Sequence, residues 1–390
     1  MPALRLAYRN VVGKGLRTWL NVAVLSLAYV LIIWHQGIFI GMLRHGSQAM
    51  IDYEVGGGQY WHRNYDPLDI LSYDDAHGRI PAELSELISK GKATPILIRQ
   101  AAIYPEGRLH SVLLKGIDLS QTVLKIPSHH LKNDKEALPV LIGKRMAKRI
   151  AMKIDDYITI RWRDAKGTFD ALEGKIVAIM DTPATAVDKG QLWVPLEALQ
   201  KMVQLENEAT LIVVGRDVVS IQDLPEWKFK EPDFLMRDII EMVRGKRVGA
   251  AILYAVLLFL AMLAIFDTQV LAIFNRRKEI GTLMALGMSR GSVILLFTLE
   301  GAMNGILAMA VGAIYGIPLL VFTAQRGITL PEVTEEFGFA IPPKLFPFYS
   351  VGLIVGTVFI VSLTVTIVSF LPTRRILKMK PTDALRGKMS

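Results

Sequence analysis

Four long apolar segments set the pattern of this chain, and polar stretches separate them. They cover residues 19–43, 248–274, 292–322 and 346–371. Each is long enough to cross a hydrocarbon layer about 30 Å thick as an α-helix, which takes about 20 apolar residues. Residues 44–247, by contrast, mix polar and apolar positions as a globular domain does. The pattern predicts a membrane protein with four transmembrane α-helices and a large domain inserted between helices 1 and 2.

The inserted domain alternates short runs rich in β-branched residues with helical patterns, which predicts an α+β fold. A domain of this length is expected to have two lobes. The predicted strands are Ile96–Ile98, Leu109–Leu114, Tyr157–Arg163, Lys175–Ile179, Gln191–Val194 and Thr210–Val214, and helices are expected at Gly143–Met152 and Pro195–Gln204.

A hairpin turn is predicted at Lys166 and Gly167, directly after a strand that ends in Arg161, Trp162 and Arg163. An exposed tryptophan between two arginines would be suited to contact a cargo or a partner. A tryptophan in a strand is more commonly a packing residue, so both interpretations remain open for these three positions.

The end of the inserted domain alternates with helical period and leads into the second apolar segment. Apolar Phe234, Ile239 and Val243 are interleaved with charged residues over Glu231–Val248, and no proline follows Pro232 in that range. The pattern predicts one continuous helical stalk that rises from the membrane. Such a stalk would carry movement between the membrane and the inserted domain.

The net charge of +9 is concentrated in three segments. Residues 1–18, 275–291 and 372–390 together hold fourteen basic and two acidic residues, a surplus larger than that of the whole chain. Positive segments beside membrane spans are typical of the cytoplasmic side, so both termini and the middle loop are expected there, with residues 44–247 and the short loop 323–345 outside. This distribution disfavours nucleic acid as a partner. Residues 1–18 have the spacing of an amphipathic helix on the inner leaflet.

Two of the apolar segments contain acidic residues. Asp267 lies near the end of the second and Glu300, followed by Gly301, lies in the third. Ionisable residues inside a membrane are candidates for a function. For Asp267, structural pairing with Arg276 or Arg277 is the favoured interpretation, and Gly301 indicates close helix packing.

No catalytic or cofactor motif occurs in the sequence. A phosphate-binding GxxxxGK[ST] loop, HExxH and GxSxG are absent, and the chain has no cysteine and no paired metal-ligand pattern. The chain is therefore expected not to be an enzyme and to hold no metal or other cofactor of its own.

The segment RRKEIGTLMALGMSR, residues 276–290, resembles the R-x-x-E-[IF]-G-x-L-x-A-[LM]-G motif of the four-span permease subunits of ABC transporters of the MacB, LolC/LolE and FtsX type. Glu300 and Gly301 match the E-G pair of the family's third span, and Pro381–Arg386 is similar to its terminal P-x-x-A-L-R. Pro139–Gly143 and the Lys175–Ile179 strand resemble the MacB-type periplasmic domain. The resemblance covers most of the chain.

In that family the middle loop is a coupling helix that sits in a groove of a separate cytoplasmic ATPase. The resemblance thus implies that ATP and magnesium are bound by a partner ATPase dimer, and that a second copy or a sister permease completes a dimer. It also implies an inner-membrane location, an amphiphilic cargo such as a lipoprotein, and a periplasmic carrier or adaptor. The implied coupling residues are Arg276, Arg277, Lys278, Glu279, Ile280, Gly281, Leu283, Met284, Ala285, Leu286 and Gly287, with the apolar ones as knobs and the charged ones as a rim.

Three functions remain open within this resemblance. The favoured function is the release of lipoproteins from the inner membrane, driven by movement that the permease transmits. A MacB-like permease for peptides or antibiotics would use the same machinery for another cargo. An FtsX-like subunit would transport nothing and would activate a cell-wall hydrolase, although the large inserted domain argues against that branch.

Overall fold

The computed structural model describes residues 16–132, 137–218, 222–329, 344–374 and 376. The chain divides into two compact units: a helical one with residues 1–42, 242–329 and 344–390, and a β-rich one with residues 43–241 and 330–343. The amphipathic helix predicted for residues 1–18 lies almost entirely outside the described residues. The same holds for most of the tail 372–390 and for most of the loop 323–345.

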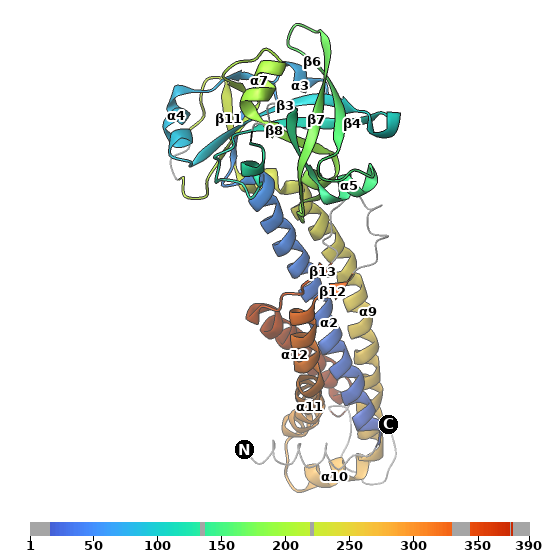
Figure 1. Ribbon diagram of the computed structural model, residues 1–390. Coiled ribbons are helices and arrows are strands. Elements are labelled where there is room, and N and C mark those ends of the chain that lie inside the picture. The colour runs from blue at the N-terminus through green and yellow to red at the C-terminus, as the bar shows by residue number, and fades with distance from the viewer. Residues whose placement is uncertain (1–15, 133–136, 219–221, 330–343, 375, 377–390) are drawn as a thin grey trace. The chain divides into compact units, whose positions relative to one another are not determined.

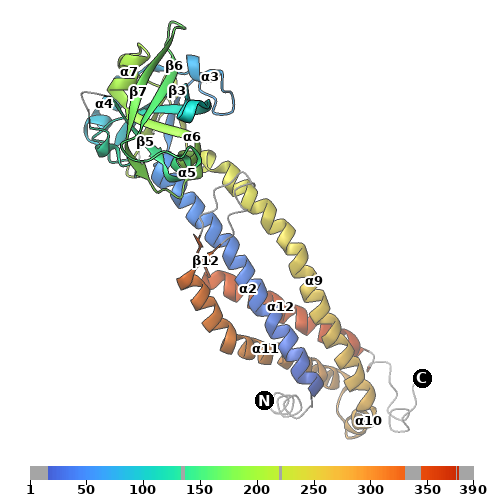
Figure 2. The ribbon, with the colours of Figure 1, turned by 45° about the vertical axis from the view of Figure 1, so that its right-hand side comes forward.

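Four helices are long and apolar enough to cross a membrane in the described part of the chain (Figure 2). They are α2 (Leu16–Met50), α9 (Arg237–Asn275), α11 (Arg290–Arg326) and α12 (Val351–Thr373). Every other helix among the described residues has nine residues or fewer. The predicted class, four spanning helices with a domain inserted between the first and the second, is confirmed.

The four helices pack through a common apolar core. Val22 and Leu25 of α2 contact Ala261 and Ile265 of α9, with Ala308 of α11 and Val361 and Val365 of α12 completing the cluster. The opposite face of α9 exposes residues such as Ile252, Phe259 and Leu263. Such large exposed apolar side chains suit a helix that faces hydrocarbon rather than water.

The stalk and the last span differ in the structure from the predicted helices. The stalk predicted from Glu231 is interrupted, because α8 (Pro232–Leu235) ends at Met236 and α9 begins only at Arg237. The last span begins at Val351 rather than at residue 346. Pro347 lacks an N–H, and Ser350 caps the helix by accepting a hydrogen bond from the Leu353 amide at 3.2 Å.

The β-rich unit is built on one sheet with the strand order β11-β1-β10-β3-β4-β8-β5-β7-β6. A further pairing of β3 with β6 closes six of these strands, β3-β4-β8-β5-β7-β6, into a barrel. The nine strands of the whole sheet are β1 (Gln59–His62), β3 (Ala93–Ile103), β4 (His110–Ile117), β5 (Leu138–Gly143), β6 (Tyr157–Arg163), β7 (Phe169–Met180), β8 (Gln191–Pro195), β10 (Leu211–Val214) and β11 (Trp227–Lys230).

Short helices and two smaller strand pairs complete the described fold (Figure 1). β2 (Gly78–Arg79) pairs with β9 (Glu208–Ala209), and in the helical unit β12 (Ile328–Thr329) pairs with β13 (Lys344–Leu345). The helices are η1 (Ile51–Val55), α3 (Ser72–Asp75), α4 (Ala82–Ser89), η2 (Pro105–Gly107), η3 (Ser128–His130), α5 (Lys144–Arg149), α6 (Thr185–Gly190) and α7 (Leu196–Met202). All six predicted strands overlap observed ones.

The prediction of two separate lobes is wrong because one long strand serves both halves of the sheet. The first residues of β3, Ala93–Ile96, pair with β10, whereas Ala101–Ile103 pair with β6 of the barrel. Every barrel strand contributes buried residues to one core that α5 and α7 also contact. A second core lies around Tyr60 and Trp227 on the β10-β1-β11 side, and a third includes Ile98 of β3 and Trp193 of β8. All three cores therefore share one sheet.

Candidate functional site: the segment between α9 and α11

A short helix, α10 (Arg277–Ala285), joins α9 to α11 at one end of the helical unit (Figure 1). Its C-terminus is closed by a left-handed residue, Gly287, whose φ is +94°. The amide of Gly287 donates to the carbonyl of Met284, and the amide of Met288 donates to the carbonyl of Leu283. A glycine adopts this conformation without strain, which explains why the chain can leave α10 sharply there.

The inner face of α10 is apolar and packs on its neighbours. Ile280 is fully buried in a cluster with Ile273 of α9 and with Val293 and Phe297 of α11. Gly281 is buried beside it, and Leu283 and Met284 pack partly against the same cluster. The interpretation of Ile280 as an outward knob is therefore wrong, since helical spacing places it on the face toward the bundle.

The outer face of α10 is polar except at its C-terminal end. Lys278, Glu279 and Ala285 are exposed, and Leu286 is 81% exposed. The space around Gly287 is open, with nothing within 4 Å of the position that a Cβ would take. An isolated, strongly exposed leucine on a rigid helix end is suited to insert into a pocket of another protein.

Arg276 connects the start of α10 to α11 through hydrogen bonds. Its guanidinium donates hydrogen bonds to both carboxylate oxygens of Glu300, at 3.1 and 2.9 Å, and also to Glu279. The guanidinium lies 4.9 Å from the centre of the Phe297 ring. Hydrogen bonds to Glu279, and then the charge of Glu300, raise the pKa of Arg276, so the group stays a cation. Because Glu300 is only 1% exposed, this pair is buried on its carboxylate side.

Glu300 and Gly301 lie where α9, α11 and α12 meet. A Cβ on Gly301 would overlap Ser369 of α12 and would lie 2.7 Å from Nε2 of Gln269 on α9. Gly301 therefore permits the close approach of three helices directly beside the Arg276–Glu300 pair.

Gly301→Ala is expected to destabilise the helical unit by about 1–3 kcal/mol, because an added methyl group forces the packed helices apart. Gly352→Ala is the matched control, since nothing lies within 4 Å of the Cβ position there. Thermal unfolding of the purified variants measures the difference, and equal melting temperatures would contradict the packing role of Gly301.

Asp267 does not pair as predicted. Among the described residues it forms no ion pair, whereas Arg276 binds Glu279 and Glu300, and Arg277 donates from Nε to the carbonyl of Phe274 at 2.8 Å. Asp267 is exposed on α9, away from the buried cluster. The helical period of α9 thus separates its carboxylate from the arginines that follow.

The three hairpin residues divide between the two faces of β6. Trp162 is 4% exposed, packs in the barrel core and donates from its indole nitrogen to the carbonyl of Met202 at 3.1 Å. Arg161 and Arg163 point outward, over the Phe169 ring at 4.8 Å and toward Asp74 at 3.6 Å. The packing interpretation therefore fits Trp162, and only the arginines are available to a partner.

Trp162→Ala is expected to destabilise the β-rich unit by about 3–5 kcal/mol, because it leaves a cavity in the barrel core. Arg161→Ala and Arg163→Ala should change stability by no more than about 0.5 kcal/mol, as exposed substitutions do. Thermal unfolding of the full chain measures both, and a small effect of Trp162→Ala would contradict its placement in the core.

The described residues contain no group of three or more histidine and acidic side chains able to hold a metal ion. The Arg276–Glu300 contact was not predicted from the sequence. The two residues lie 24 positions apart, and the only available signal was an arginine at the start of the loop and an acid inside an apolar segment.

Comparison with known proteins finds a family model that includes the site. Residues 251–381, with α10 and the Arg276–Glu300 pair, match the model of the FtsX-like permease C-terminal family. Four helices in the described part of the chain are long and apolar enough to span a membrane, and the chain is similar to multi-pass permeases of the FtsX and LolC type.

The relatives found are similar over parts of the chain. The lipoprotein-releasing system transmembrane protein LolC of Xylella fastidiosa is 21% identical over 270 residues, 63% of this chain and 64% of its own. The chain thus spans less than two thirds of that relative. An uncharacterized ABC transporter permease of Methanocaldococcus jannaschii is 31% identical over 142 residues, 36% of this chain and 32% of its own. The ABC transporter permease YtrF of Bacillus subtilis is 26% identical over 145 residues, 37% of this chain and 33% of its own.

Among solved structures, the extracellular domain of the noncanonic ABC-type transporter YknZ from Gram-positive bacteria is similar to this chain. It is 12% identical, with a TM-score of 0.26, and the match covers 42% of this chain and 84% of that one.

Proposed function

We propose that this chain is the membrane subunit of an ABC transporter and that α10 is its coupling helix. The observation that carries this proposal is the pair of faces on α10: one buries Ile280 against α9 and α11, and the other presents Leu286 at 81% exposure. A helix fixed on one side and apolar at an exposed end is suited to enter a groove on a partner. The partner would be a cytoplasmic ATPase dimer, which would bind ATP and magnesium.

The Arg276–Glu300 pair would transmit a displacement of α10 into the bundle. Its two hydrogen bonds tie the first turn of α10 to α11, and Gly301 brings the same turn of α11 against α12 and Gln269 of α9. Both bonds come from Nη1 of Arg276, and a contact that is buried on its carboxylate side resists sliding more than an exposed ion pair does. Movement of α10 would therefore shift three spanning helices together.

The orientation we propose follows from charge. Residues 275–291 carry four basic residues and one acidic one, and the segments at both termini are also basic. The positive-inside rule places these segments in the cytoplasm and the β-rich unit in the periplasm of the inner membrane. α9 is one helix over 39 residues, which gives movement at its α10 end a stiff path toward the β-rich unit.

We propose that the cargo is an amphiphile, and we favour a lipoprotein that is released from the membrane. The support is the similarity to a relative whose name is lipoprotein-releasing system transmembrane protein. The complex would contain a second permease copy or a sister permease, because four helices per chain enclose little space. A periplasmic carrier or adaptor would complete the route, with Arg161 and Arg163 as exposed contact residues.

Purification of the tagged chain in mild detergent, followed by mass spectrometry of what it retains, tests this function. An ABC ATPase together with acylated lipoproteins is the expected result. Retention of an outer-membrane channel and adaptor would replace lipoprotein release with peptide or antibiotic efflux. Retention of a cell-wall hydrolase would indicate a subunit that only transmits force. Absence of any ATPase would contradict the proposal as a whole.

A further inference from the structure

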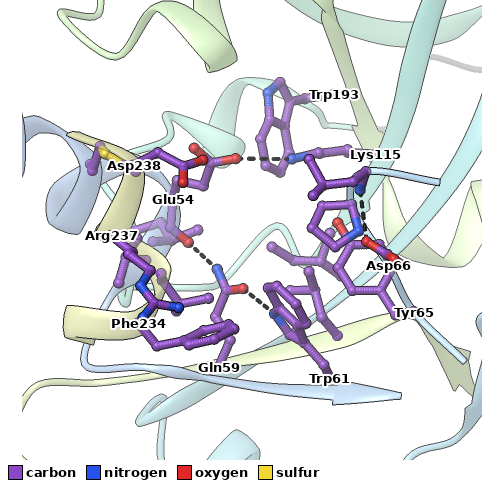
Figure 3. A pocket seen from close by; sticks show the side chains of 18 residues that line it. Glu54, Gln59, Trp61, Tyr65, Asp66, Lys115, Trp193, Phe234, Arg237 and Asp238 are labelled. Carbon is purple, nitrogen blue, oxygen red and sulfur yellow. Dashed lines mark hydrogen bonds and ion pairs between the residues drawn. The ribbon is translucent and has the colours of Figure 1, made fainter. Parts of the chain in front are cut away.

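The β-rich unit contains a pocket of about 460 Å³ whose lining includes no residue of the segment between α9 and α11 (Figure 3). This volume falls within the range of roughly 300–1,000 Å³ that small-molecule sites occupy. Its lining comes mainly from η1, from strands β1, β3, β4, β8 and β10, from residues 65–68, and from α8 and the start of α9. Most of the lining side chains are apolar or aromatic, so water alone would be a poor occupant.

One wall of the pocket is an aromatic cluster held in place by hydrogen bonds. Gln59 donates to the carbonyl of Glu54 at 2.7 Å and accepts from the indole nitrogen of Trp61 at 2.6 Å. The Trp61 ring meets those of Tyr65 and Phe234 edge to face, at 5.0 and 6.1 Å between centroids. This bonding fixes the orientation of the wall before any ligand arrives.

A buried lysine lies on the opposite wall. Lys115 of β4 is 6% exposed, and its ammonium lies 5.2 Å from the centre of the Trp193 ring. Figure 3 shows its side chain extending along this ring toward Glu54. Within the described residues Glu54 is its only carboxylate partner, at 3.7 Å, which is too long for a hydrogen bond. Burial lowers the pKa of Lys115, and the charge of Glu54 opposes this effect.

This arrangement leaves hydrogen-bonding capacity on Lys115. An ammonium has three N–H donors, and burying it is unfavourable unless they are matched. Glu54 keeps a partly exposed side chain, 27%, so it can turn toward water when another anion approaches. An anionic group that enters the pocket would therefore meet an ammonium whose N–H donors are only partly matched by the protein.

Two of the three other charged side chains that line the pocket have partners, and the third, Asp238, is exposed. Asp66 accepts a hydrogen bond from the backbone of Leu68 at 2.9 Å, and Arg237 pairs with Glu241 at 3.1 Å. Lysine side chains already lie beside the aromatic rings of the pocket, so these rings offer little to a cationic ligand. Lys115 covers Trp193, and Lys230 lies 5.6 Å from the Trp61 centroid and 4.6 Å from that of Phe234.

We propose that this pocket binds an anionic amphiphile, with the acidic head on Lys115 and a single apolar chain along the aromatic wall. Leu124 and Leu211 continue the apolar lining, and Leu68, 89% exposed, stands at the rim where a chain would enter. The head can be a carboxylate or a phosphate, since both accept charge-assisted hydrogen bonds from an ammonium. This site does not depend on an ATPase partner, so its failure would leave the coupling proposal untouched.

Photolabelling of the full chain in phosphatidylcholine nanodiscs tests the site. The probe is a dodecanoate that carries a diazirine near the end of its chain, and labelled peptides are located by mass spectrometry. Labels are expected on the segments that contain Trp61 and Phe234. Unlabelled dodecanoate and dodecyl phosphate should compete, and whichever competes better identifies the head group. Dodecyltrimethylammonium should compete at least about tenfold more weakly.

Two substitutions should change labelling in opposite directions. Lys115→Met is expected to weaken binding by about tenfold or more, because it removes a charged donor. Glu54→Gln should strengthen it, because it removes the competing and repelling carboxylate. Lys90→Met, at an exposed lysine paired with Glu86, is the matched control and should have no effect. Equal labelling of wild type and Lys115→Met, equal competition by the cationic amphiphile, or labels confined to other segments would overturn the proposal.

Discussion

Leu286→Gln is expected to weaken association with the partner ATPase by about 30-fold or more and to abolish the dependence of ATP hydrolysis on the permease. Leu286 is 81% exposed at the end of α10, and a central apolar anchor at an interface commonly contributes about 2 kcal/mol or more. Because the side chain has few contacts within its own chain, folding should change by no more than about 0.5 kcal/mol. Co-purification of the ATPase and its turnover in the reconstituted complex measure the effect.

Lys278→Gln is the matched control for this prediction. Lys278 is exposed on the same helix and lies in the charged rim, where a partly solvated ion pair contributes only about 0–1 kcal/mol. Its replacement by the same polar residue should therefore leave association nearly unchanged. If both variants lost the ATPase equally, the apolar anchor would not be the dominant contact. If neither lost it, α10 would not be the docking element.

The second large effect is expected at the Arg276–Glu300 pair. Arg276→Met removes the cation that faces a carboxylate with 1% exposure, and breaking such a buried pair costs about 3–5 kcal/mol. Glu300→Gln should cost less, because Arg276 keeps its hydrogen bonds to Glu279 on the exposed side. The apparent melting temperature of the purified chain in nanodiscs measures stability, and ATPase stimulation measures coupling.

The double variant Arg276→Met/Glu300→Gln shows whether the two residues act as a pair that transmits movement or act independently. Stability should recover toward wild type, since no buried charge is left without its partner. Coupling should stay impaired, because the connection between α10 and α11 is still missing. Losses of stability that simply add in the double variant would contradict the pairing, and restored coupling would contradict the transmitting role.

Much of the fold was predictable because it depends on local pattern. The four apolar segments were long enough to identify the spanning helices from length alone. The β-rich run Tyr157–Arg163 was predicted as a strand, and the structure places Ile158, Ile160 and Trp162 inward and Arg161 and Arg163 outward. Helix ends were less predictable, since the start of α12 depends on the side chain of Ser350.

Long-range contacts were not predictable from the sequence. Closure of the barrel depends on pairing between Ala101–Ile103 and residues about sixty positions later in β6, which no local pattern signals. In the candidate site, the sequence motif predicted the position of α10, but Ile280 was assigned to the outer face of this helix, whereas it lies on the inner face. The helical period gives relative positions of side chains, and only packing against Val293 and Phe297 shows which face turns inward.

The most direct test of the account is photocrosslinking from position 286 in native membranes. A photoreactive phenylalanine analogue replaces Leu286 in one variant and Phe259 in another. Phe259 is 59% exposed on the apolar part of α9 and serves as a control within the span. The account predicts a crosslink to an ABC ATPase from position 286 and none from position 259. An ATPase that fails to crosslink from position 286 while it co-purifies with the chain would contradict the assignment of α10 as the coupling helix.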